Sequence, residues 1–220
     1  MFIRKRYFML GTSNERDIVR ILFIIYFCGQ VQNPTLFDEY TYTHVIDSET
    51  RLQKIDFWLR YPDHFANALL QEYQKNDQFR TRVQEIKQTV RSVFADQEPI
   101  LRLIPMQKYL RGAYEPRDDV MTFLISRSLA VQRGGYQKQY FLTSKGKSVV
   151  ERILQECSES QWYASRCKLI QKFFGNLNGH YLRNLQYSEE VYKTAKLLET
   201  ISPIESTVRE RFANIFGEEL

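Results

Sequence analysis

The spacing of hydrophobic positions between residues 118 and 154 predicts a helix, a hairpin of two strands and a second helix. The first helix is indicated by apolar residues at helical intervals, which are expected to form its buried face, namely Val120, Phe123, Leu124 and Leu129. Two short apolar runs, Leu129–Val131 and Tyr140–Leu142, predict the strands. The polar stretch between them contains Gly134-Gly135, and paired glycines suit a tight hairpin because they tolerate positive φ.

The segment after the hairpin is predicted to be a helix that begins at a capping hydroxyl. Thr143 or Ser144 can accept a hydrogen bond from the first helical turn. Apolar residues then recur on one side of the helix, at Val149, Val150, Ile153 and Leu154. With a short helix expected over Met106–Ala113, this order of elements is typical of a winged helix-turn-helix, which we place at residues 96–155.

Helical patterns also predominate on both sides of that module. A helix from Ser13 or Asn14 to about Phe27 is apolar nearly all round, so it is expected at the centre of the fold or in an oligomer interface. Asn33-Pro34 predicts a turn. The further helices are expected over Asp47–Arg60, after Tyr61-Pro62, over 74–92, over Gln161–Phe174, over Ser188–Ile201 and from Pro203. The predicted fold is therefore mainly α with one β-hairpin, a helical N-terminal region (1–95) and a helical C-terminal region (156–220).

Positive charge is concentrated in the predicted wing. The chain has a formal net charge of +5, and residues 127–152 carry six cations against the single anion Glu151: Arg127, Arg133, Lys138, Lys145, Lys147 and Arg152. Such a basic hairpin can contact DNA phosphates, and Arg127, Arg133, Lys138, Lys145 and Lys147 are the candidate DNA-binding residues. Alternatively, these cations solvate an exposed hairpin and bind nothing.

The helix before the wing argues against sequence-specific DNA recognition. It opens with Asp118-Asp119, whose carboxylates repel phosphates, and it offers Met121, Thr122 and Ser126. Arg, Asn and Gln are the side chains that form bidentate contacts to base edges, and none of them lies on this helix. Protein–protein contact is therefore favoured over base reading, with non-specific backbone contact by the wing left open.

No pattern in the chain predicts catalysis, a cofactor or a metal site. The sequence contains no phosphate-binding loop, dinucleotide-binding glycine motif or metalloprotease motif. Cys28, Cys157 and Cys167 are isolated from one another and from the histidines, so they predict reduced, inert thiols of a cytoplasmic protein. Glu49 and Asp56 are expected to form surface ion pairs with nearby arginines and lysines rather than an acid–base pair. We therefore expect a protein that is not an enzyme.

Aromatic and apolar residues outside the module predict a place where a partner docks. Trp58 lies on an apolar helix face, and Tyr181, Leu185 and Tyr187 make the C-terminal helices apolar. These residues can instead close the domain's own core. A membrane span is not predicted, because the apolar run Ile21–Cys28 is far shorter than the roughly 20 residues that a bilayer requires.

Part of the chain resembles a bacterial family of small accessory proteins. The residues that carry this resemblance are ETRLQKIDFWLRYPDHFANALL (Glu49–Leu70), RGAYE (Arg111–Glu115) and the YFLTSKG exit of the hairpin. They are similar to the middle components of three-component systems built around an ABC-type ATPase, of which the Lamassu anti-phage systems are the best known. The resemblance covers about residues 50–160, and the YFLTSKG exit also occurs in many winged-helix repressors.

The resemblance implies a non-catalytic subunit that binds an SMC- or Rad50-like ATPase and helps to control a nuclease effector acting on plasmid or phage DNA. It implies no catalytic residues. The alternative is a dimeric winged-helix transcriptional regulator that binds operator DNA through its wing and third helix.

Overall fold

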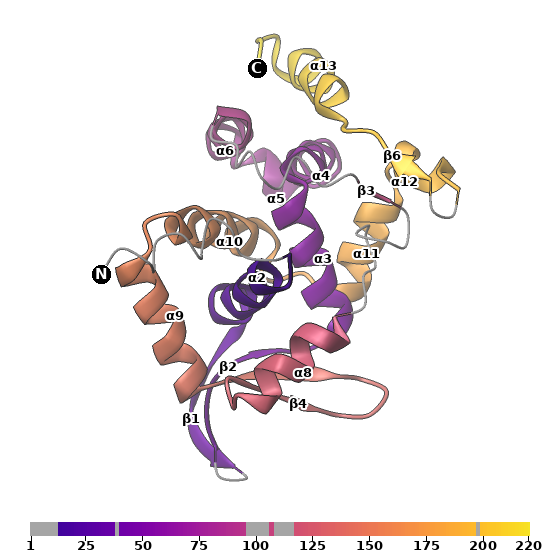
Figure 1. The fold of residues 1–220 in the computed structure, drawn as a ribbon. Helices are drawn as coiled ribbons and strands as arrows, with labels where there is room; N and C mark the ends of the chain where they lie inside the picture. The colour runs from indigo at the N-terminus through magenta and orange to yellow at the C-terminus, as the bar shows by residue number, and fades with distance from the viewer. Residues whose placement is uncertain (1–12, 38–39, 96–105, 108–116, 197–198) are drawn as a thin grey trace. The chain divides into compact units, whose positions relative to one another are not determined.

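The computed structural model describes residues 13–37, 40–95, 106–107, 117–196 and 199–220 (Figure 1). The helices are α2 (Ser13–Cys28), α3 (Glu49–Arg60), α4 (Pro62–Lys75), α5 (Asp77–Arg80), α6 (Val83–Ala95), α8 (Asp118–Ser126), α9 (Ser144–Glu156), α10 (Ser160–Phe174), α11 (Gly179–Tyr187), α12 (Glu190–Thr194) and α13 (Glu205–Phe216). The strands are β1 (Gln30–Phe37), β2 (Tyr40–Ile46), β3 (Met106–Gln107), β4 (Ala130–Arg133), β5 (Gln139–Thr143) and β6 (Thr200–Ile201). The protein is thus mainly helical, as the sequence predicted.

Contacts between residues divide the chain into two compact units, each assembled from two separate stretches. Unit 1 comprises the described residues within Met1–Leu52 and Pro116–Gln171, and unit 2 those within Gln53–Glu115 and Lys172–Leu220. The sequence suggested three consecutive regions, whereas each unit combines residues that are far apart along the chain. Pairings of such long sequence separation leave no local pattern, so sequence spacing alone does not reveal them.

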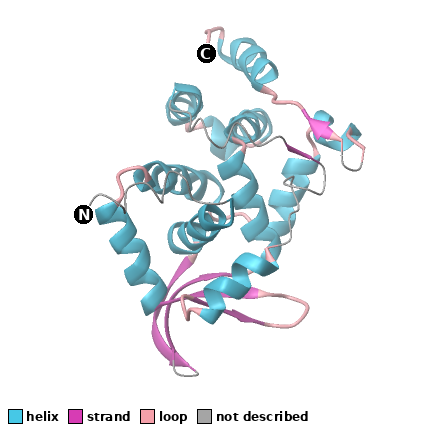
Figure 2. Cartoon of the chain, in the orientation of Figure 1, coloured by secondary structure: helices cyan, strands magenta, loops and turns pink. Residues whose placement is uncertain are grey.

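Unit 1 contains an antiparallel sheet of four strands in the order β1-β2-β5-β4 (Figure 2). The predicted hairpin is present as β4 and β5, with Ala130 opposite Leu142 and Arg133 opposite Gln139. It is not an isolated wing, because β5 also pairs with β2, where Ile46 lies opposite Tyr140. The prediction of one hairpin was therefore incomplete.

The second hairpin, β1 with β2, replaces the turn that Asn33-Pro34 predicted. Both residues lie inside β1, where the pairing register shifts between Val31 and Thr35. β1 is an edge strand of the sheet. Proline lacks a backbone N–H, so an edge strand with an irregular register is where a strand tolerates it.

The core of unit 1 forms around α2, as its apolar sequence predicted. Ile21–Ile25 and Cys28 have at most 1% of their surface exposed, and the helix contacts α8, α9, β2 and β5. The helix ends where Gly29 N–H donates to the carbonyl of Ile25 at 3.2 Å. Arg20 is also buried in this core, where it pairs with Asp17 at 2.7 Å.

The elements around the β4–β5 hairpin begin and end near their predicted bounds, but the buried side of α8 differs from the prediction, because Phe123 is 41% exposed and Met121 is buried. α8 buries Val120, Met121 and Leu124, and α9 begins after Thr143, whose hydroxyl accepts from Gly146 N–H at 3.0 Å. Thr143 is thus the N-cap. A Cβ at Gly146 would lie 2.1 Å from the carbonyl oxygen of Leu129, so glycine is needed where α9 passes the start of the hairpin.

Unit 2 is built on α4 and its aromatic neighbours. α3 ends at Arg60 and α4 begins at Pro62, as the Tyr61-Pro62 pair predicted. Proline suits the first position of a helix because its missing N–H would have no partner there. Trp58, Phe65 and Phe174 pack together, with ring centroids 4.6 Å apart for Trp58–Phe174 and 5.6 Å apart for Phe65–Phe174.

Three helix predictions in unit 2 were wrong in detail. The polar helix over 74–92 is interrupted: Asn76 caps α5 by accepting from Gln78 N–H at 3.0 Å, and α6 follows separately. The helix expected over Ser188–Ile201 is reduced to α12, and β6 follows it and pairs with β3. Met106 and Gln107 therefore form a strand instead of starting a helix, while the remainder of that prediction, 108–113, lies outside the described residues.

Candidate interaction surface

The exposed side of α8 combines acidic and apolar residues. Asp118 and Asp119 occupy its first turn, and Asp118 keeps 78% of its side-chain surface exposed. Phe123 and Ile125 are 41% and 40% exposed, although most large apolar residues of unit 1 are buried. Such a side is suited to contact with protein, since the two carboxylates repel phosphate and neither apolar side chain can form a hydrogen bond to a base edge.

The hairpin beside α8 is shaped by one glycine at its tip. Gly134 has φ of +77°, and a Cβ there would lie 2.1 Å from the carbonyl oxygen of Gln137. Gly135, which the sequence paired with it, has no such restriction, and a Cβ there would meet nothing within 4 Å. Tyr136 follows at the tip and is fully exposed. The tight turn thus presents an aromatic ring to solvent.

Arg133, a candidate DNA-binding residue, is held against the sheet. Its guanidinium donates to the hydroxyl of Tyr42 at 3.1 Å and lies 5.1 Å from the centre of that ring and 5.6 Å from the centre of the Phe141 ring. Tyr42 lies on β2, the strand that the sequence did not predict. An arginine stacked in this way is partly committed to its own sheet.

Lys138 is placed between two carboxylates of its own unit. Its Nζ lies 3.4 Å from Glu49 Oε1 and 3.5 Å from Asp118 Oδ1. The charge of Glu49, with a smaller contribution from Asp118, raises the pKa of Lys138 above its ordinary value. Glu49 was expected to pair along its own helix, and its partner instead lies 89 residues away. The positive charge of Lys138 is therefore largely balanced within unit 1.

The other three candidate cations also contact their own unit. Lys145 donates to the carbonyl of Arg127 at 2.9 Å, and Lys147 lies 3.8 Å from Glu151 one helical turn away. The Arg127 guanidinium lies 5.7 Å from the centre of the Phe123 ring. The structure thus places all five predicted DNA-binding residues on or beside the hairpin, but surrounds them with carboxylates, carbonyls and rings that reduce what they offer to phosphate.

The four predicted partner-binding residues differ in exposure. Trp58 is 1% exposed and Leu185 is 6% exposed, so both lie in the core of unit 2. Tyr187 is half-buried, and its ring centre lies 5.2 Å from that of Tyr192. Tyr181 is 40% exposed, and its hydroxyl lies 3.0 Å from Glu72 Oε1. Of the four, Tyr181 presents the most surface.

Unit 2 buries an ion pair that the sequence placed at the surface. Asp56 and Arg60 are 3.0 Å apart, with only 2% and 5% of their side chains exposed. The pairing four residues apart was predicted, but the burial was not, since almost every side chain of α3 is enclosed. Charged residues on a short helix give no signal of such burial.

A second buried pair links α4 to the residue before α12. His64 Nδ1 forms a hydrogen bond with Glu189 Oε2, and neither residue has more than 4% of its surface exposed. Burial by itself lowers the pKa of His64, but the charge of Glu189 and the hydrogen bond outweigh it and raise that pKa above its ordinary value. The pair therefore holds a buried charge and is not accessible to a substrate.

The three cysteines differ in burial. All three are free, and Cys28 and Cys167 are buried. Burial and the neighbouring Glu159 raise the pKa of Cys157, whereas a nucleophilic thiol needs a lowered pKa. Among the described residues no group of three or more His, Cys, Asp or Glu is arranged to hold a metal ion. In the same part of the chain, no helix has the length and apolar character needed to cross a membrane.

Sequence reasoning missed two determinants of this surface. One is β2, whose alternating run YTYTHVI carries β-branched and aromatic residues at every position but one and could have been recognised as a strand. The other is the proximity of Glu49 to Lys138, for which the sequence holds no signal. No protein family matches this chain, and neither the curated proteins nor the solved structures contain a match to it.

Proposed function

We propose that this chain is a non-catalytic accessory or scaffold subunit of a cytoplasmic ATPase complex that acts on phage or plasmid DNA. In this proposal α8, the β4–β5 hairpin and α9 form a winged helix whose main task is protein–protein contact. The partners are an SMC- or Rad50-like ATPase and a nuclease effector. These two partners rest on the resemblance of Glu49–Leu70 and the hairpin exit to the middle components of ABC-ATPase defence systems.

One observation carries the docking role of α8. Its exposed side offers Asp118, Asp119, Phe123 and Ile125, while Lys138 beside it is balanced by carboxylates of its own unit. A surface that reads DNA needs the reverse, with cations free to meet phosphate and amide or guanidinium groups facing the groove. The proposal therefore assigns α8 to a protein partner and leaves to the hairpin a weak, non-specific contact with the DNA backbone.

Co-purification from the native host tests the docking role. A coiled-coil ATPase should be recovered with the wild-type chain, and Phe123→Asp should weaken that association about tenfold or more, because it places a charge in the apolar part of the contact. Val31→Asp is the control, since Val31 is another exposed apolar residue of unit 1, on β1. Recovery of no such ATPase, or an equal effect of both substitutions, would contradict the proposal.

DNA titrations separate this proposal from a transcriptional regulator. The isolated chain should bind a random duplex weakly, with no more than about tenfold preference for any palindromic fragment, whereas a regulator discriminates by about a thousandfold or more. The hairpin contact predicts that Arg133→Ala combined with Lys138→Ala lowers the slope of log affinity against log salt, by at most about 2 because both cations also interact within unit 1. An unchanged slope excludes phosphate contact by these two residues.

A further inference from the structure

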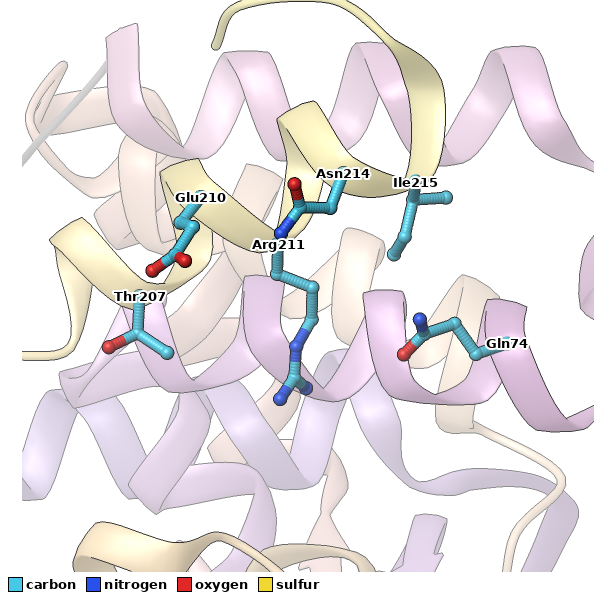
Figure 3. A pocket seen from close by; sticks show the side chains of 6 residues that line it. All are labelled: Gln74, Thr207, Glu210, Arg211, Asn214 and Ile215. Atoms are coloured by element: carbon cyan, nitrogen blue, oxygen red, sulfur yellow. The ribbon is translucent and has the colours of Figure 1, made fainter.

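The helices α4 and α13 of unit 2 border a polar hollow of about 520 Å³ (Figure 3). One stripe of α13 forms most of its lining, and Gln74 of α4 faces it. The residues from α13 are Thr207, Glu210, Arg211, Asn214 and Ile215. Sites for small molecules have volumes of roughly 300–1,000 Å³, but they are mostly apolar. Among the described residues that line it, only Ile215 is apolar, so the hollow suits a small and polar ligand.

Arg211 supplies the positively charged group that lines the hollow. Its side chain extends from α13 toward the helix that carries Gln74 (Figure 3). The Nη1 atom is buried and has no hydrogen-bond partner in the part of the chain that the structure describes. A ligand in the hollow cannot reach this buried atom, so recognition falls to the rest of the half-buried guanidinium, for which the oxygen of a carboxylate or phosphate is the best complement. Arg211 is therefore suited to bind an anionic group.

Arg209 is a second arginine on α13, but unlike Arg211 it has partners among the described residues. It lies two residues earlier on a different face, is exposed, and pairs with Glu205 Oε1 at 2.8 Å. It also donates to the carbonyl of Leu220. Both arginines lie on α13, but Arg209 has hydrogen-bond partners within the chain, whereas Arg211 lines the hollow.

Glu210 restricts which anion the hollow accepts. Its carboxylate lies in the same lining, beside Thr207 (Figure 3), and forms no ion pair with a described residue. With Arg211 it brings the charge of the lining to zero, so a simple anion gains little net attraction. A ligand that places an anionic group on Arg211 and a cationic or N–H donor group on Glu210 satisfies both.

We propose that the hollow between α4 and α13 binds a small zwitterion. Its carboxylate or phosphate contacts Arg211, and its amino group contacts Glu210. The amides of Gln74 and Asn214 and the hydroxyl of Thr207 supply further donors and acceptors. This site lies in unit 2 and is independent of the docking role of α8, so failure of either proposal leaves the other standing.

Four small molecules test whether the hollow binds the anionic group and the amino group of one ligand together. 4-Aminobutyrate and phosphoethanolamine each carry both charges, whereas butyrate and butylamine carry one each. Saturation-transfer NMR on the full chain, with each probe at about 10 mM, should show binding of at least one zwitterion and weaker binding of both single-charge probes. The stronger zwitterion identifies the anionic group as carboxylate or phosphate. Absence of transfer to both zwitterions, or equal transfer to all four probes, overturns the proposal.

Substitutions on α13 test which residue binds the anionic group of the ligand and which binds its amino group. Arg211→Gln should lower affinity for the preferred zwitterion by about tenfold or more, because it removes a charge-assisted hydrogen bond. Arg209→Gln, the matched control, should leave affinity unchanged. Glu210→Gln should reverse the selectivity, so that butyrate binds at least as well as 4-aminobutyrate, and this exposed substitution does not disturb the core. Equal effects of Arg211→Gln and Arg209→Gln, or unaltered selectivity in Glu210→Gln, overturn the proposal.

Discussion

The charged residues of the β4–β5 hairpin and of the first turn of α8 lie at the surface of unit 1, whereas Asp56 and Arg60 of α3 and His64 of α4 are buried in unit 2. Lys138 and Asp118 keep 28% and 78% of their side chains exposed, while Asp56 and Arg60 keep 2% and 5%. Both regions form ion pairs, but water screens the first set and is excluded from the second. The same residue types therefore contribute little to folding in one region and much in the other.

This difference gives the two regions different sensitivities. An exposed pair contributes about 0–1 kcal/mol, since water solvates either charge almost as well as its partner does. Removing one member of a buried pair leaves an uncompensated charge and costs about 3–5 kcal/mol. Substitutions should therefore affect unfolding strongly in the buried region and only slightly at the hairpin, where their effects should appear in binding.

The largest effect is expected at the buried His64–Glu189 pair. His64→Ala should lower the free energy of unfolding by about 3–5 kcal/mol, because Glu189 remains buried without its partner. Urea unfolding followed by circular dichroism measures this loss. Arg209→Ala removes an exposed pair from the same unit and is the control, with an expected loss below about 1 kcal/mol. Similar losses for the two variants would mean that burial does not separate the regions as argued.

The same pair should make stability depend on pH. The pKa of His64 is raised in the folded protein, so its contribution is complete below its unfolded pKa of about 6.5 and is lost as pH rises through the folded value. Lys54 acts in the opposite direction, since burial lowers its pKa to about 7 and folding becomes more favourable as pH rises above that value. The difference between wild type and His64→Gln isolates the histidine, and this difference should shrink with rising pH. A difference that does not vary with pH would contradict the raised pKa.

The sequence predicted features that depend on neighbouring residues better than contacts between residues far apart along the chain. The cap at Thr143, the break at Tyr61-Pro62 and the end of α2 near Phe27 each depend on neighbours within a few residues, and all three were predicted. The pairing of β5 with β2 and the contact of Lys138 with Glu49 join residues about 90 positions apart, and neither was predicted. The acidic first turn of α8 was predicted, whereas the exposure of Phe123 and Ile125 and the pairing of Lys138 with carboxylates of its own unit were not.

At the hairpin tip, a backbone substitution should have a larger effect than any charge there. Gly134→Ala should cost about 1–3 kcal/mol of unfolding free energy, because alanine resists a φ of +77° and its Cβ would lie against the carbonyl of Gln137. Gly135→Ala is the matched neighbour, with open space around its Cβ, and should change stability by less than about 0.5 kcal/mol. If both variants unfold at the same urea concentration, the tip is not held by Gly134.

Removing the N-cap of α9 should lower the free energy of unfolding by less than the substitution at Gly134 can, but by more than the loss of an exposed charge. Thr143→Ala should cost about 1–2 kcal/mol, since its hydroxyl accepts from Gly146 N–H and donates to the carbonyl of Ser128 at 2.8 Å. Thr143→Ser keeps both hydrogen bonds and should recover most of the loss. Failure of serine to recover stability would assign the effect to the missing methyl group rather than to the cap.

The smallest effect on folding is expected from the wing cations themselves. Lys147→Ala removes a pair with Glu151 in which both side chains are more than 40% exposed, so the free energy of unfolding should change by about 0.3–0.5 kcal/mol or less. Lys138→Ala should also stay below about 1 kcal/mol, although two carboxylates surround it, because water solvates Glu49 and Asp118 once the lysine is absent. Raising the salt concentration should reduce both effects further, whereas the His64→Ala loss should persist in high salt because the buried pair is not screened. A salt-independent loss above about 2 kcal/mol at Lys138 would place it with the buried pairs of unit 2 and would remove the distinction between the two regions.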